Sequence, residues 1–260
     1  MNLYQAIFLG VVQGLTEFLP VSSSGHLVFF QSLFGLKEAP VFFDVMLHFG
    51  TLLAVIIYFS KDIWRIIVGT GSALRGKGGE DTKLFLWIVL GTVPAGLAGI
   101  LFKDWFESLF SKPKWVGGML ILTALVLYLT RYTKKEGRPL ERMKWFDSVL
   151  IGIAQAVAII PGISRSGITI STGLFCGLDR ELSGRFSFLL SVPAILGATL
   201  LEFKKIDPGH QFWAVLLGTL LAFGVGILSL TFLMKMIKLG KIAGFSYYCC
   251  GFGVVMIILT

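Results

Sequence analysis

Two related polar stretches interrupt sequence that is otherwise apolar enough to cross a bilayer. They cover residues 10–27 (GVVQGLTEFLPVSSSGHL) and 152–169 (GIAQAVAIIPGISRSGIT), and they align without a gap. The proline, glycine and serine residues in the middle of each stretch break a helix, and ionisable groups are costly at the centre of a membrane. Such stretches must be enclosed by protein or line a wet cavity.

The two stretches share several residues but differ in the ones that carry charge. The identical positions are Gly10/Gly152, Gln13/Gln155, Ser22/Ser164, Ser24/Ser166 and Gly25/Gly167. The differing positions are Glu17/Ile159, Ser23/Arg165 and His26/Ile168. One stretch is therefore acidic and contains a histidine, whereas the other is basic.

The overall composition excludes an ordinary soluble domain. The 260 residues are 55% hydrophobic and only 15% charged, and their mean hydropathy is +0.81. The formal charge of +8 comes from Lys and Arg in short loops, which indicates membrane orientation and not a nucleic-acid partner. Cys176, Cys249 and Cys250 have neither metal-ligand spacing nor a disulfide pattern. We expect a polytopic helical membrane protein without an organic cofactor.

The lengths of the apolar runs predict which segments cross the membrane. A spanning helix needs about 17 to 25 residues. Six runs reach this length: 41–59, 85–102, 115–132, 184–203, 211–231 and 242–259. Shorter apolar segments flank the polar stretches, at 3–19 with 25–36 and at 147–160 with 167–178. Each pair is interpreted as a re-entrant hairpin with a polar tip, and a longer loop is expected around residues 60–84.

The polar stretches belong to a longer internal duplication. Residues 91–101 (GTVPAGLAGIL) resemble residues 218–228 (GTLLAFGVGIL), so each half holds one re-entrant helical hairpin plus three transmembrane helices. An odd number of spans gives the two halves opposite orientations, which is an inverted-topology repeat. The sequence thus predicts an all-α polytopic membrane protein. It forms a single membrane domain over residues 1–260, with repeat 1 at about 1–140 and repeat 2 at about 145–260.

The basic residues of the loops predict the orientation. Most of the 23 Lys and Arg residues fall on one side of this layout, for example in the 133–144 loop, and few fall on the other, as at Lys112. By the positive-inside rule the richer side is cytoplasmic and both termini are outside. The first hairpin then enters from outside and the second from the cytoplasm, so their tips can meet near mid-membrane.

The tips carry groups that suit phosphoryl chemistry. Each tip places Ser and Gly just before a short helix, whose unpaired N–H groups and dipole favour an anion. Arg165 adds a planar fork of donors. Hydroxyl donors for phosphate oxygens come from Ser164, Ser166 and Thr169 of the second tip and from Ser22 and Ser24 of the first.

Three residues of the first tip could perform the reaction. Ser23 is the candidate nucleophile, and His26, three residues later, could fold back over it to exchange protons. Glu17 could orient the histidine, act as a base or help to hold a divalent cation. Two alternatives stay open, namely His26 as the nucleophile and direct attack by water.

Structural roles compete with these chemical ones. Ser22 and Ser24 could serve only as helix caps. Glu17 and Arg165 could form a buried ion pair that holds the hairpins together. His48 rivals His26, because Asp44 lies four residues earlier on the same helix face; for this pair we favour a supporting contact over direct catalysis.

The motifs QGLTEFLPVSSSGH at 13–26 and PGISRSGIT at 161–169 closely resemble the two signatures of the undecaprenyl pyrophosphate phosphatase family, also called bacitracin-resistance proteins. The resemblance covers the whole chain. It implies hydrolysis of undecaprenyl diphosphate to the monophosphate carrier lipid of peptidoglycan synthesis, at a periplasm-facing site of the bacterial inner membrane. It also implies catalysis by Glu17, Ser23 and His26, with Ser164, Arg165 and Thr169 gripping the diphosphate.

The resemblance further implies a divalent cation, Mg²⁺ or Ca²⁺. The family has Glu or Gln at the first signature position, and here it is Gln13. A neutral amide is a weaker ligand for a hard cation than a carboxylate. Glu17 is therefore the main candidate metal ligand, with the substrate's phosphate oxygens completing the site.

Two other functions fit parts of the sequence. A transporter or flippase of an anionic prenyl lipid would also use inverted repeats with broken helices, but it has no evident need for a nucleophile beside a base. The type 2 phosphatidic acid phosphatases share Ser-Gly-His and Ser-Arg motifs, but they need a second His shortly after the Ser-Arg. No His occurs between Arg165 and His210, so this second function is rejected.

Overall fold

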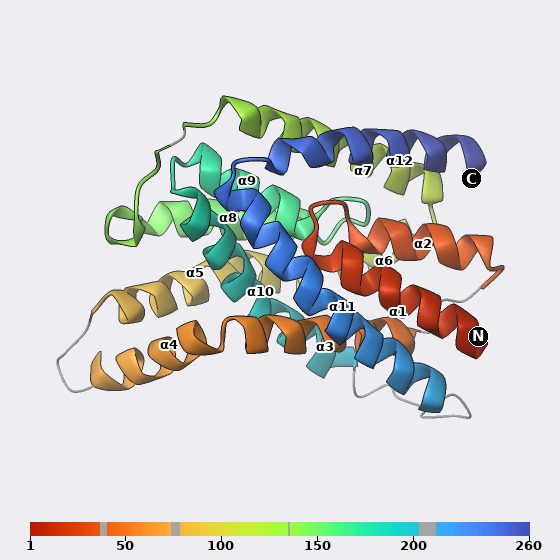
Figure 1. Cartoon of the computed structure of the whole chain (residues 1–260), viewed down its shortest axis with the longest axis horizontal. Coiled ribbons are helices and arrows are strands. Elements are labelled where there is room, and N and C mark those ends of the chain that lie inside the picture. Colours follow the sequence, from red (N-terminus) through yellow and green to blue (C-terminus); the bar gives the residue numbers. More distant parts are fainter. Residues whose placement is uncertain (37–40, 74–78, 135, 203–211) are drawn as a thin grey trace.

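The computed structural model describes residues 1–36, 41–73, 79–134, 136–202 and 212–260, and the regular elements in these ranges are helices. The chain forms an elongated helical bundle with both termini at one end (Figure 1). The α-helices are α1 Leu3–Phe18, α2 Ser23–Leu33, α3 Val41–Tyr58, α4 Ser60–Ala73, α5 Glu80–Leu101, α6 Lys103–Phe110, α7 Pro113–Leu129, α8 Trp145–Val157, α9 Arg165–Phe175, α10 Arg180–Glu202, α11 Phe212–Lys238 and α12 Phe245–Leu259.

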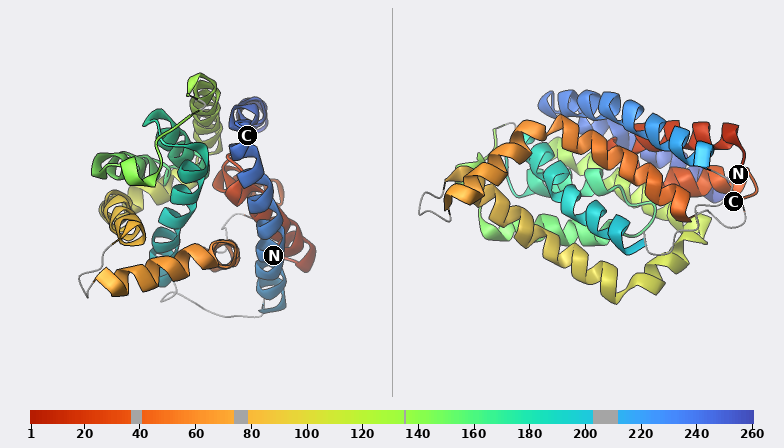
Figure 2. Two further views of the ribbon diagram at one scale, coloured as in Figure 1. Left: turned by 60° about the vertical axis from the view of Figure 1, so that its left-hand side comes forward. Right: turned by 90° about the horizontal axis from the view of Figure 1, so that it is seen from below.

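The long apolar helices agree with the expected spans. Within the described ranges, helices α5, α7, α10, α11 and α12 are long and apolar enough to cross a membrane, and α3 with α4 forms a sixth candidate. The chain is thus an all-helical, multi-pass membrane protein, as the sequence predicts. Two of the spans, α7 and α12, lie side by side along one edge of the bundle, and Figure 2 shows the same pairing from a second direction.

Both polar stretches fold as helix–turn–helix hairpins. Helices α1 and α2 form the first hairpin, and α8 and α9 form the second. These helices have 11 to 16 residues, which corresponds to about 16–24 Å and is shorter than a bilayer core of about 30 Å. The tips are buried between the other helices, with Ser22 at 3% and Ser164 at 2% exposure.

The prediction of a loop around residues 60–84 is wrong over most of its length, because residues 60–73 form helix α4. This helix turns by 72° from α3 and packs against α5. The helix carries Lys61, Asp62 and Arg65 beside apolar residues such as Ile66, so it is amphipathic and too polar to be recognised as a span by itself. An ion pair of 2.7 Å between Asp62 and Arg185 attaches α4 to α10.

Glycines let each hairpin approach a long helix closely, and that long helix belongs to the other half of the chain. A Cβ atom at Gly10 of α1 would collide with the backbone carbonyl of Gly218 of α11. Likewise, a Cβ atom at Gly152 of α8 would collide with the carbonyl of Gly91 of α5. Each hairpin therefore packs against a long helix of the opposite half, through positions that are equivalent in the internal duplication.

The second tip is held in place by helix α7. The hydroxyl of Thr123 donates to the carbonyl of Gly162 at 3.1 Å and accepts from the backbone N–H of Ser164 at 3.1 Å. Gly162 has a φ of 94°, and a side chain there would strike the carbonyl of Val116. Glycine is required at this turn for both reasons.

Candidate active site

A cavity of about 650 Å³ lies where the two hairpin tips meet. Polar lining residues at the hairpins and on α3 and α10 are Glu17, Ser22, Ser23, Ser24, His48, Gln155, Ser164, Arg165 and Ser191. Further polar lining residues are Thr92 of α5, Lys103 and Glu107 of α6 and Thr199 of α10. The rest of the wall is mostly apolar and includes residues of α5, α6, α8 and α10. The volume lies within the usual range for small-molecule sites, and the mixed wall suits a ligand with a polar head and an apolar tail.

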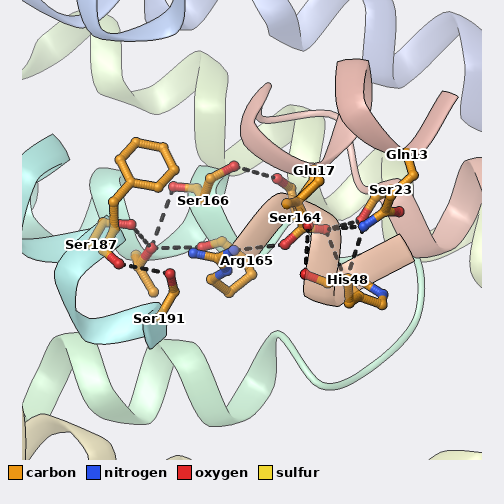
Figure 3. A network of polar contacts seen from close by, with 12 residues as sticks. Gln13, Glu17, Ser23, His48, Ser164, Arg165, Ser166, Ser187 and Ser191 are labelled. Atoms are coloured by element: carbon orange, nitrogen blue, oxygen red, sulfur yellow. Dashed lines mark hydrogen bonds and ion pairs between the residues drawn. The ribbon is translucent and has the colours of Figure 1, made fainter. Parts of the chain in front are cut away.

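Glu17 and Arg165 join the two hairpins at the centre of this wall. Arg165 donates from Nη2 to Oε1 of Glu17 at 2.7 Å, and the two side chains are 16% and 6% exposed. Figure 3 shows Arg165 reaching across from the second hairpin to the carboxylate of the first. The other terminal nitrogen, Nη1, is buried and has no hydrogen-bond partner among the described residues. One terminal nitrogen of the guanidinium therefore binds Glu17, and the other could donate to an anion in the cavity.

Ser23 lies on the first tip, within hydrogen-bond distance of the same carboxylate. Its hydroxyl donates to Oε2 of Glu17 at 2.6 Å. Ser22, immediately before it, has a φ of 66°, which is an uncommon and strained conformation for a residue with a side chain. This turn places Ser23 at the first position of α2, in contact with the cavity. A serine hydroxyl that donates to a carboxylate can lose its proton to that group during nucleophilic attack.

His48 and Gln13 complete the surroundings of Glu17. Gln13 donates from Nε2 to Oε2 of Glu17 at 3.1 Å, and the same nitrogen lies 3.0 Å from Nδ1 of His48. His48 Nδ1 is 3.4 Å from Oε2 of Glu17. The expected orienting partner of His48, Asp44, instead accepts hydrogen bonds from Gln31. His48 therefore contacts the carboxylate of Glu17, whereas the sequence led us to expect Asp44 as its partner.

Both ring nitrogens of His26 contact groups other than the Ser23 hydroxyl, and His26 is not among the residues that line the cavity, so the expected folding back of its ring over Ser23 is not found. Its Nδ1 lies 2.8 Å from the carbonyl oxygen of Ser22, and its Nε2 lies 2.7 Å from the hydroxyl of Tyr248 on α12. The ring stacks on Phe252 with a centroid distance of 4.1 Å. These contacts fix the imidazole against α12, and its bond to the Ser22 carbonyl supports the Ser22 turn.

The remaining expected phosphate ligands divide into two groups. Ser22, Ser24 and Ser164 line the cavity, whereas Ser166 and Thr169 are buried outside the set of lining residues. Thr169 donates to the carbonyl of Arg165 at 2.6 Å and lies 2.6 Å from the hydroxyl of Ser187. It therefore supports the first turn of α9.

Ser24 and Ser166, which are equivalent positions, link the hairpins to each other. Ser24 Oγ accepts from the backbone N–H of Gly162 at 3.5 Å, and Ser166 Oγ donates to the carbonyl of Leu19 at 3.4 Å. Ser24 of the first hairpin thus contacts the second hairpin, and Ser166 of the second hairpin contacts the first. The tips are positioned by these bonds together with the Glu17–Arg165 pair.

A divalent cation fits this site only in part. The described residues contain no group of three or more His, Cys, Asp or Glu side chains that could hold a metal ion. The two oxygens of Glu17 already accept from Arg165, Gln13 and Ser23. One further oxygen is free, because Oε1 of Gln13 is buried without a partner in the described part of the chain.

Sequence reasoning missed two residues that shape the tips, Tyr248 and Thr123. Tyr248 lies 222 residues from His26 in the chain, and Thr123 lies 41 residues from Ser164. Both belong to apolar runs that read as ordinary spans. A polar residue inside such a run is the only local signal that could have identified them.

The fold and the site together define a class: an integral membrane protein with a polar, phosphate-compatible site enclosed between two helical hairpins. Residues 6–255 match the family described as Bacitracin resistance protein BacA, and the chain belongs to this family. The relatives include proteins named undecaprenyl-diphosphatase from Desulforapulum autotrophicum, 44% identical over 99% of this chain and 98% of the relative, and from Halothermothrix orenii, 42% identical over 100% and 99%. A further one, from Methanosphaera stadtmanae, is 42% identical over 100% and 99%.

Proposed function

We propose that this chain hydrolyses undecaprenyl diphosphate to undecaprenyl phosphate and inorganic phosphate. The reaction would recycle the carrier lipid of peptidoglycan synthesis and confer resistance to bacitracin. Family membership and the name undecaprenyl-diphosphatase carried by the relatives support this substrate. The observation that carries the proposal is the Ser23–Glu17–Arg165 cluster in a cavity with an apolar wall.

In the first half of the reaction, Ser23 Oγ attacks the terminal phosphorus. The bond between that phosphorus and the bridging oxygen breaks, undecaprenyl phosphate departs, and the Ser23 proton moves to Glu17. In the second half, water attacks the phosphorus of phosphoserine and the bond to Oγ breaks. Ser23 then recovers its proton from Glu17, while both protons of the water remain on the released phosphate.

Positive charge and N–H donors would stabilise the transferring phosphoryl group. Nη1 of Arg165 has no hydrogen-bond partner among the described residues, and the planar guanidinium suits phosphate oxygens. The first turns of α2 and α9 begin at Ser23 and Arg165, so backbone N–H groups of both helices add to this field. Ser164, Ser22 and Ser24 supply hydroxyls at the same wall.

The other residues of the expected site would act through positioning. His26 would keep the Ser22 turn in the strained form that presents Ser23, which differs from direct proton exchange. Ser166 and Thr169 would fix the second tip and so aim Arg165. His48 and Gln13 would hold Glu17 by hydrogen bonding to or near Oε2.

A divalent cation, Mg²⁺ or Ca²⁺, would enter with the substrate. Of the two candidate ligands, Glu17 lines the cavity and Gln13 does not, so the carboxylate of Glu17 would contact the ion and phosphate oxygens would supply most of the other ligands. When bound, the ion would neutralise charge on the diphosphate. The residues of the chain keep the roles given above.

We also propose that the two halves form an inverted repeat with the hairpins re-entrant from opposite sides. Repeat 1 covers about residues 1–140 and repeat 2 about 145–260, in one membrane domain. The exchanged packing of Gly10 on Gly218 and of Gly152 on Gly91 supports this symmetry, because both pairs join equivalent positions. The protein would lie in the bacterial inner membrane, with both termini and the mouth of the site on the periplasmic side.

Phosphate release by the purified protein in detergent tests the proposed activity. An enzyme continues to turn over substrate without a membrane barrier, whereas a transporter or flippase of an anionic prenyl lipid has no measurable activity there. Release of inorganic phosphate from undecaprenyl diphosphate is expected. A well-folded protein that binds the lipid without releasing phosphate would rule out the phosphatase and leave the transporter.

A further inference from the structure

Gln155 on α8 lines the cavity with an amide group that lacks a hydrogen-bond partner among the described residues. The residue is 4% exposed, and neither Nε2 nor Oε1 is paired. A buried amide without partners destabilises a folded protein, so such a group is normally satisfied or replaced by an apolar one. Its location on the cavity wall points to a ligand as the missing partner.

Comparison with the first hairpin explains why the amide is unpaired. Gln13, the equivalent residue, uses Nε2 for Glu17 and His48. In the second half, Ile159 stands in the position of Glu17 and has no polar atom. Aligning residues 43–48 (FDVMLH) with residues 186–191 (FSFLLS) places Ser191 in the position of His48, and its hydroxyl donates to the carbonyl of Phe188. The second half therefore keeps the glutamine without the partners of the first.

A second unpaired donor faces the same cavity from the same hairpin. Nη1 of Arg165 is buried and unpartnered within the described chain, while Nη2 of this residue is committed to Glu17. An amide N–H and a guanidinium N–H are both donors, and the non-bridging oxygens of a phosphate are acceptors. Both residues line one cavity, so these two donors can serve the two phosphates of a bound diphosphate.

The position of Gln155 along α8 indicates which phosphate it would meet. Ser23 lies on the first hairpin, where it is bonded to Glu17, so the reacting terminal phosphate belongs there. Ile159 lies in the turn after α8, between Gln155 and the second tip, and it approaches Gly99 of α5 on the apolar wall of the cavity. The amide is therefore farther along the hairpin from the tip than this apolar contact, on the side where the phosphate that bears the lipid would join its prenyl chain.

We propose that the amide of Gln155 binds the phosphate that remains on the lipid, beside the transferring phosphoryl group that Nη1 of Arg165 would hold. This subsite would make the enzyme select a prenyl diphosphate over a compound with a single phosphate. The inference rests on the proposed function and deepens it, because it assigns separate partners to the two phosphates of the substrate.

The test replaces the amide with an apolar side chain of similar length in Gln155→Met. For undecaprenyl diphosphate, KM is expected to rise roughly 10- to 100-fold, which corresponds to the loss of one hydrogen bond to a charged group, while kcat stays within about threefold. The inhibition constant of farnesyl monophosphate should rise by the same factor, and that of inorganic phosphate should not change. Thermal stability without ligand should be equal or higher, because an unpaired buried amide has been removed.

Gln31→Met is the matched control. Gln31 is also buried, at 5% exposure, but it bonds to Asp44 and does not line the cavity. This variant should lose thermal stability and keep both inhibition constants. If Gln155→Met does not fold, Gln155→Asn, whose shorter amide withdraws from the cavity, should change the constants in the same direction.

Three results would overturn the inference. Unchanged KM and inhibition constants in Gln155→Met would mean that the amide contacts no phosphate. A rise confined to the inhibition constant of inorganic phosphate would mean that Gln155 binds the terminal phosphate instead. A fall in thermal stability with unchanged KM and inhibition constants would mean that its role is structural. Stabilisation of the wild-type protein by farnesyl monophosphate, read from Tm, tests the subsite without turnover, so its outcome is separate from failure of the phosphatase activity.

Discussion

Replacing Arg165 with lysine keeps the positive charge but removes the two-nitrogen fork of the guanidinium. The variant therefore tests whether Arg165 must bind Glu17 and the substrate at the same time. One terminal nitrogen of Arg165 is held by Glu17 at 2.7 Å and the other is free for the substrate. A lysine has one nitrogen and cannot serve both partners in the same geometry. Loss of a preorganised donor to the transition state lowers kcat by about 10²- to 10³-fold, or roughly 2.7 to 4 kcal/mol. We expect a loss of this size for Arg165→Lys.

The alanine variant separates catalysis from stability at the same position. Arg165→Ala also leaves the 6%-exposed carboxylate of Glu17 without its cation, and breaking a buried pair in this way costs about 3 to 5 kcal/mol. It should therefore lower Tm markedly as well as abolish phosphate release, whereas Arg165→Lys should lower Tm less.

Phosphate release and Tm of the detergent-solubilised variants give both quantities. Arg185→Lys is the control, because Arg185 pairs with Asp62 at the same 2.7 Å distance but does not line the cavity. This control should keep wild-type turnover. Turnover of Arg165→Lys within about threefold of wild type would refute the fork argument and show that a single positive charge suffices.

Two further predictions concern the base and the topology. Glu17→Gln should lose at least about 100-fold in phosphate release, because the amide cannot accept the Ser23 proton, and it should also lower Tm, because Arg165 loses its buried anionic partner; full activity with a lowered Tm would instead make the Glu17–Arg165 contact a structural ion pair. Single cysteines in the 133–144 loop should be labelled only from the cytoplasm and those near Lys112 only from outside, and labelling of both from one side would exclude the inverted repeat.

The outline of the fold could be predicted because membrane constraints act on local sequence. Apolar run length determines which helices can span, and the helix-breaking residues at 20–25 and 161–167 interrupt two hairpins that are too short to cross. The same reasoning failed for residues 60–73, because an amphipathic helix at the end of a span has the polar composition of a loop. Its packing on α5 and its ion pair to α10 are tertiary contacts that no local pattern encodes.

The site was predictable where the chemistry is carried by charge. An acid on one tip and an arginine on the other suggest that they meet, and Glu17 and Arg165 are in contact. The direction of the His26 side chain could not be predicted from its spacing to Ser23, because it depends on Tyr248 and Phe252 of α12. Thr169 likewise turns to Ser187, a residue of another helix.

The turnover of Ser23→Ala tests the central claim most directly. Ser23 is the residue whose hydroxyl donates to Glu17 at the cavity wall, and Ser24, the next residue, offers a matched control with the same change of side chain. If Ser23 is the nucleophile, Ser23→Ala should lose roughly 10³-fold or more in phosphate release from undecaprenyl diphosphate at unchanged Tm, whereas Ser24→Ala should stay within about tenfold of wild type. Substantial turnover by a folded Ser23→Ala protein would contradict the account, because binding alone cannot replace an obligatory nucleophile.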